Sequence, residues 1–86
     1  MHACGHDGHM ALLLGFAKYL KYLKKIKKSV VLVFQPAEEG PGGAKWIMDS
    51  GILQELQVKK IYGYHLYPSL PEGILGLAKG PLMARN

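Results

Sequence analysis

Three short groups of polar residues have the side chains that metal-assisted chemistry needs. In the first group, Cys4 and His6 are separated by a single glycine. In an extended or looped backbone, residues two apart can face the same ion, and Gly5 relieves the steric demand between them. A thiolate and an imidazole suit zinc and other borderline divalent metals. The pair alone is a weak signal, because histidines at a helix start or a remnant of an expression tag would look the same.

The second group is the adjacent pair Glu38 and Glu39, which follows Gln35-Pro36-Ala37. Neighbouring carboxylates repel each other, so a cation or separate roles must offset the cost of placing them after a buried strand. Side chains one position apart diverge, so that one could bind a metal while the other acts as a general base toward a substrate. The alternative is a solvated acidic turn.

The third group is His65, flanked by Tyr64 and Tyr67. A histidine at the end of an apolar strand often serves as a packed residue at the core or its rim, and the tyrosines suit packing. The joint occurrence of a thiol, two imidazoles and a carboxylate pair at element boundaries favours a metal site. Its ligands come from separate elements, unlike the paired cysteines of a small structural zinc module, and this favours a catalytic site.

An amphipathic helix is expected from about Gly8 to Lys27, with Asp7 as a capping carboxylate at its start. Its apolar face comprises Leu13, Phe16, Ala17, Leu20 and Leu23, with Ile26 in a less regular position.

The rest of the chain predicts an α/β fold in the order helix, strand, helix, strand, strand. The strands are expected at 30–34, 60–66 and 73–79, and the second helix at 44–50 with Gly51 as its stop. Strand, helix and strand would form a right-handed βαβ unit in a mostly parallel sheet. Glu38, Glu39 and His65 would then lie beyond the carboxyl ends of strands, where open α/β sheets bind ligands. Trp46, Met48 and Leu53 are expected in the core.

Composition excludes several other classes of protein. The 86 residues are 49% hydrophobic and 20% charged, so the chain is not expected to be disordered. No apolar run exceeds five residues, so no membrane span is expected, and the first residues do not resemble a signal peptide. A single cysteine suggests a reducing compartment, and we expect a cytoplasmic protein.

The net charge of +5 comes largely from a lysine-rich stretch. Lys18, Lys21, Lys24, Lys25, Lys27 and Lys28 supply six of the eleven cations. They suit a solvated helix face and a helix end, where cations are favoured, better than a nucleic-acid motif. We therefore expect neither a nucleic-acid nor a membrane partner, and a basic interaction module remains the weakest alternative.

The ordered set of motifs resembles a known family of metal-dependent amidohydrolases. Its members include hippurate hydrolases, N-acyl-amino-acid deacetylases and indole-acetyl-amino-acid hydrolases, within the wider aminoacylase and zinc carboxypeptidase family. The matching segments are Met1-His2-Ala3-Cys4-Gly5-His6-Asp7-Gly8-His9, Val33-Phe34-Gln35-Pro36-Ala37-Glu38-Glu39-Gly40, Gly63-Tyr64-His65 with Pro68, and Gly80-Pro81-Leu82-Met83-Ala84.

The resemblance implies a role for each site residue. Cys4, His6, Glu39 and His65 would be metal ligands, and Glu38 would be the general base. The cofactor would be one or two divalent ions of zinc, manganese, cobalt or nickel. These would polarise an amide carbonyl and acidify a water, whose proton Glu38 would take and pass to the departing amine. The substrate would be a small N-acyl amino acid or a similar amide.

The resemblance also implies that residues 1–86 form part of a larger catalytic domain. Relatives are several times longer and have a second domain for dimerisation and substrate binding, which is absent here, so the parent protein is expected to be a homo-oligomer. Missing neighbours would leave apolar faces exposed. A non-catalytic metal-binding module that uses Cys4, His6, Glu39 and His65 is the main alternative.

Overall fold

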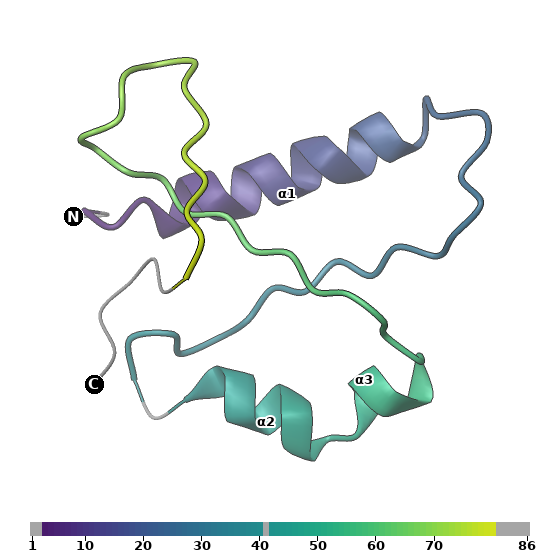
Figure 1. Cartoon of the computed structure of the whole chain (residues 1–86). Coiled ribbons are helices and arrows are strands. Elements are labelled where there is room, and N and C mark those ends of the chain that lie inside the picture. The colour runs from purple at the N-terminus through teal and green to yellow at the C-terminus, as the bar shows by residue number, and fades with distance from the viewer. Residues whose placement is uncertain (1–2, 41, 81–86) are drawn as a thin grey trace.

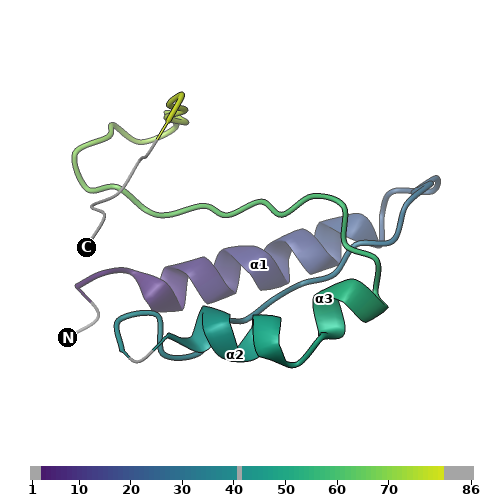
Figure 2. The same cartoon turned by 60° about the horizontal axis from the view of Figure 1, so that its bottom comes forward.

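The computed structural model describes residues 3–40 and 42–80. Within them, the chain forms α1 (His6–Leu20), α2 (Gly43–Asp49) and α3 (Ile52–Glu55). Long irregular segments connect α1 to α2 and follow α3, whereas only residues 50–51 separate α2 from α3 (Figure 1). The two short helices α2 and α3 follow one another and contact each other, and the longer α1 contacts neither of them (Figure 1 and Figure 2). The motif Gly80-Pro81-Leu82-Met83-Ala84 lies largely outside the described residues.

Helix α1 is shorter than the sequence pattern predicts. It ends at Leu20, because beyond it lysines three and four positions apart repel one another on the helix surface. Leu23 and Ile26 are 42% and 44% exposed, so burial does not offset that repulsion. On the expected apolar face Leu13, Ala17 and Leu20 are half-buried, whereas Phe16 is exposed.

The expected cap at the start of α1 is wrong. The N-cap residue is Gly5 in the left-handed conformation, with no side-chain capping hydrogen bond, and Asp7 lies inside the first helical turn. There its carboxylate still faces the positive end of the helix dipole.

Helix α2 agrees with the expectation to within one residue. It runs from Gly43 to Asp49, and Gly51 follows with a φ of 74°, as expected of a glycine just beyond a helix end. The adjacent helix α3, which starts at Ile52, was not expected.

The predicted α/β fold with a mostly parallel sheet is wrong for this structure. Residues 30–34, 60–66 and 73–79 are irregular, and the described part of the chain contains no strand. No backbone hydrogen bond joins any of these runs within that part. An apolar, β-branched run specifies a preference for burial, but a strand exists only where a second segment pairs with its backbone.

The molecule is expanded, and its apolar side chains are poorly covered. Its radius of gyration is 14.9 Å, against about 12 Å for a compact domain of this length. Its accessible surface is 8409 Å², against about 5,000 Å² for a compact chain of this mass. No hydrophobic side chain among the described residues is fully buried, and Trp46 and Met48, expected in the core, are 55% and 62% exposed. Leu53 is half-buried.

No helix among residues 3–40 and 42–80 is long and apolar enough to cross a membrane.

Candidate metal centre

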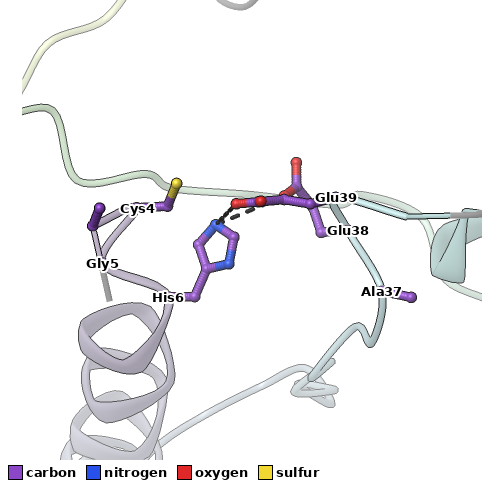
Figure 3. A pocket seen from close by; sticks show the side chains of 7 residues that line it. Cys4, Gly5, His6, Ala37, Glu38 and Glu39 are labelled. Atoms are coloured by element: carbon purple, nitrogen blue, oxygen red, sulfur yellow. Dashed lines mark ion pairs between the residues drawn. The ribbon is translucent and has the colours of Figure 1, made fainter. Parts of the chain in front are cut away.

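The start of α1 places the Cys4 thiol and the His6 imidazole on the same side of the chain. Gly5 has a φ of 70°, a conformation that side-chain-bearing residues rarely adopt, and this turns the backbone into the helix. Cys4 is exposed just before the helix, and His6 is its first residue. The turn thus lets Cys4 and His6 face the same space (Figure 3).

A tight loop presents the two glutamates to that space. The Ala37 carbonyl accepts hydrogen bonds from the backbone N–H groups of Gly40 (3.3 Å) and Gly43 (3.4 Å). Gly43 is buried against Pro36, so closely that an added Cβ atom would lie 1.7 Å from the Pro36 carbonyl oxygen. The start of α2 therefore closes the loop that carries Glu38 and Glu39.

The two segments meet around an open pocket of about 510 Å³, lined by residues 3–6 and 37–39. His6 Nε2 lies 3.7 Å from Glu38 Oε2 and 3.6 Å from Glu39 Oε1 (Figure 3). Ligand atoms of Cys4, His6 and Glu39 all lie within 4.8 Å of one another. Glu38 borders this group without belonging to it.

This donor set fits a divalent ion of the zinc type. Ligands of one tetrahedral ion at bond lengths of about 2.0–2.3 Å lie about 3.4 Å apart, close to the separation of His6 Nε2 and Glu39 Oε1. Sulfur, nitrogen and oxygen donors in one group match zinc better than magnesium or calcium, which prefer oxygen alone.

The acidic loop also changes the chemistry of the thiol. The pKa of Cys4 is raised, mainly because its side chain hydrogen-bonds with Glu39 and because the negative charge of that carboxylate opposes formation of a thiolate. Without an ion, the proton on Cys4 thus prevents repulsion between a thiolate and the Glu39 carboxylate. A bound cation would compensate both negative charges, so that Cys4 could lose its proton.

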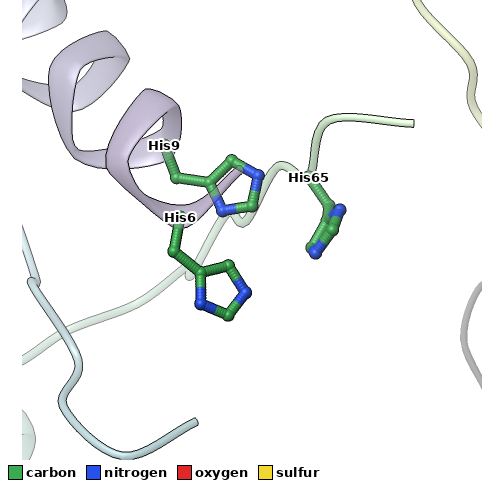
Figure 4. A group of neighbouring side chains, drawn as sticks. All are labelled: His6, His9 and His65. Carbon is green, nitrogen blue, oxygen red and sulfur yellow. The ribbon is translucent and has the colours of Figure 1, made fainter. Parts of the chain in front are cut away.

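His65 belongs to a second group, a cluster of three imidazoles that also contains His6 and His9 (Figure 4). The ring centroids of His65 and His6 are 6.0 Å apart, and those of His65 and His9 are 4.4 Å apart. Ligand atoms of the three histidines lie within 4.8 Å of one another, and His6 is the member shared with the Cys4–His6–Glu39 group. The structure thus brings the other four predicted site residues close to His6, with His65 outside the group that contains Cys4.

His9 is a further neighbour of His6, and its place in the sequence predicts no role for it. It lies three residues after His6 and therefore on the same face of α1, a spacing that could have signalled its proximity. Its pKa is lowered, first by burial and then by the neighbouring His65 and His6, since each disfavours a second positive charge.

Comparison with known proteins identifies the family. The model of Peptidase family M20/M25/M40 matches residues 1–80, so the chain belongs to this family and the resemblance seen in its motifs is confirmed. It is 49% identical over 85 residues to IAA-amino acid hydrolase ILR1-like 4 of Arabidopsis thaliana. It is 46% identical over 86 residues to N-acetyldiaminopimelate deacetylase of Priestia megaterium, and 45% identical over 85 residues to N-acetylcysteine deacetylase of Bacillus subtilis.

These alignments cover 98%, 100% and 98% of this chain but only 19%, 23% and 22% of the three relatives. The chain thus spans about a fifth of the length of the relatives it matches. No solved structure matches it.

Proposed function

We propose that the protein carrying this chain hydrolyses the amide bond of small N-acyl amino acids or related amides with the help of one or two divalent ions. The observation that carries the proposal is the convergence of Cys4, His6 and Glu39 within 4.8 Å, with a second carboxylate, Glu38, beside them. The names of the relatives, which are amino-acid conjugate hydrolases and deacetylases, support the same reaction class.

Each residue has a distinct task in this proposal. Cys4, His6 and Glu39 hold a divalent ion, and His65 supplies a further ligand from the adjoining histidine cluster. The soft thiolate and the imidazole favour zinc, with manganese, cobalt and nickel as alternatives. When bound, the ion polarises the amide carbonyl and lowers the pKa of a water. Glu38 is outside the ligand group but within the pocket, so its carboxylate is free to take a proton from the attacking water and return it to the departing amine nitrogen.

The decisive experiment distinguishes the roles of the two adjacent glutamates in the intact natural protein. Glu38→Gln should lower turnover of N-acetylated amino acids by about 10²–10⁴-fold, since it removes a general base, while leaving the metal content unchanged. Glu39→Gln should lose the metal itself. Glu72→Gln, which changes an exposed carboxylate outside the pocket, is the matched control and should retain both.

The outcomes distinguish the candidate functions. Full turnover by Glu38→Gln would contradict the assignment of the base. Stoichiometric metal binding without hydrolysis of any N-acyl amino acid by the unmutated protein would instead support a non-catalytic metal-binding module.

A further inference from the structure

His9 is the member of the histidine cluster whose ring accepts a hydrogen bond from a backbone N–H. Its Nε2 accepts a hydrogen bond of 3.0 Å from the backbone N–H of Leu66. A neutral imidazole that accepts at Nε2 carries its proton on Nδ1, so this ring offers no free lone pair to an ion. Its proximity to His6 and His65 therefore needs a different explanation from metal ligation.

His65 has the opposite arrangement. Its Nδ1 lies 2.6 Å from the backbone carbonyl oxygen of Leu66, a geometry in which Nδ1 donates its proton. Nε2 then keeps its lone pair. Ligating histidines are commonly oriented by such a bond from the other ring nitrogen to a backbone carbonyl. The neighbouring hydrogen bonds thus prepare His65 as a ligand and His9 as an anchor.

The anchor holds the chain on both sides of His65. The Tyr64 hydroxyl donates a hydrogen bond of 2.5 Å to the backbone carbonyl of His9, and the Leu66 N–H donates to the His9 ring. Within residues 3–40 and 42–80, these are the hydrogen bonds that join the segment around His65 to α1. The bonded residues are 55 and 57 positions apart in the sequence.

Packing reinforces the same attachment. The side chain of Leu66 lies over the glycines at the start of α1, where an added Cβ atom at Gly5 or Gly8 would come within 3.1 or 2.9 Å of Leu66 Cδ1. The side-chain-free surface of these glycines makes room for Leu66. His65, between Tyr64 and Leu66, is thereby held with its ring toward His9 and His6 (Figure 4).

We propose that His9 is a positioning residue: it fastens residues 64–66 to the start of α1 and so places His65 beside His6 as a metal ligand. This inference rests on the proposed function, since it assumes an ion held by Cys4, His6 and Glu39. It assigns His9 no contact with the ion or the substrate.

The test is a cobalt(II) titration of the intact metal-free protein, followed by absorption spectroscopy. Cobalt bound to Cys4 gives a thiolate charge-transfer band, and its d–d bands report the remaining ligands. His9→Leu should keep the charge-transfer band, change the d–d bands and weaken cobalt binding by about 10–100-fold. His9→Gln places an amide oxygen near the former Nε2 and should restore binding to within about threefold of the unmutated protein.

A double-mutant cycle with His65→Ala links the effect to His65. If His9 acts through His65, the His9→Leu change should cause little further loss of affinity in a protein that already carries His65→Ala. Unchanged affinity and spectrum in His9→Leu would overturn the proposal, as would additive losses in the double variant or failure of His9→Gln to rescue binding.

The same spectra distinguish failure of this inference from failure of the proposed function. The unmutated protein could show a charge-transfer band that Cys4→Ser loses, while His9→Leu changes neither the d–d bands nor the cobalt affinity. That result would overturn the role of His9 alone. Absence of the band in the unmutated protein would overturn both.

Discussion

Replacement of Gly43 by alanine tests whether the start of α2 holds the acidic loop at the metal centre. The added Cβ atom would lie 1.7 Å from the Pro36 carbonyl oxygen, whereas Cβ atoms essentially never approach other atoms within 3.0 Å. The backbone on one side must therefore move by about 1.3 Å to reach even that limit. Because the obstacle is a backbone carbonyl rather than the end of a flexible side chain, no rotamer change relieves the clash.

The displacement exceeds what a preformed site tolerates. Functional groups must be held to within about 0.5 Å of their working positions, and the loop that would move carries Glu38 and Glu39. We expect Gly43→Ala to weaken zinc binding by about 10–100-fold, and to lower the free energy of unfolding by about 1–3 kcal/mol, as overpacking of a tight site usually does.

The assay is a zinc titration with a thermal melt of the intact protein, and Gly15→Ala is the control. Gly15 lies within α1, and an added Cβ atom there would meet nothing within 4 Å. Alanine at this position should leave zinc affinity unchanged and raise the free energy of unfolding by about 0.5–1 kcal/mol, because glycine is a poor helix former. Zinc affinity in Gly43→Ala equal to that of the unmutated protein would refute the argument that the contact with Pro36 fixes the loop.

Two further predictions concern the thiol and a surface ion pair. Because the thiolate is the reactive form and the pKa of Cys4 is raised, alkylation of Cys4 by iodoacetamide in the metal-free protein should become fast only at a higher pH than for free cysteine. Glu39→Gln should lower that pKa and shift the rate profile to lower pH; mass spectrometry of the Cys4 peptide would show this, and an unchanged profile would contradict the role of Glu39. The exposed Lys45–Asp49 pair on α2, with Nζ and Oδ2 2.5 Å apart, should contribute little. Asp49→Asn should lower the free energy of unfolding by less than about 0.5 kcal/mol in a denaturant titration, and a loss above 1 kcal/mol would show that the pair is more than a surface contact.

The secondary structure could be predicted only where local signals decide it. The end of α2 could be predicted from Gly51, because a helix often ends where the next residue adopts the left-handed conformation, and glycine adopts that conformation most readily. The predicted end of α1 is seven residues too late, because apolar periodicity through Leu23 and Ile26 indicates a helix only if another surface covers that face. In the structure both side chains remain exposed. The run 30–34 failed as a strand for a related reason, because its residue types express a preference for burial and contain no information on which backbone would pair with it.

The sequence by itself determined the donor types and the family, because thiol, imidazole and carboxylate chemistry depends on residue identity and the ordered motifs identify the M20/M25/M40 relationship. The tertiary structure decided which donors share a space, and it placed Glu39 but not Glu38 in the group with Cys4 and His6. It also revealed His9, whose ring and backbone carbonyl bond to residues 55 and 57 positions away. Such contacts depend on where the folded backbone brings distant segments together, and no local propensity at residue 9 encodes that.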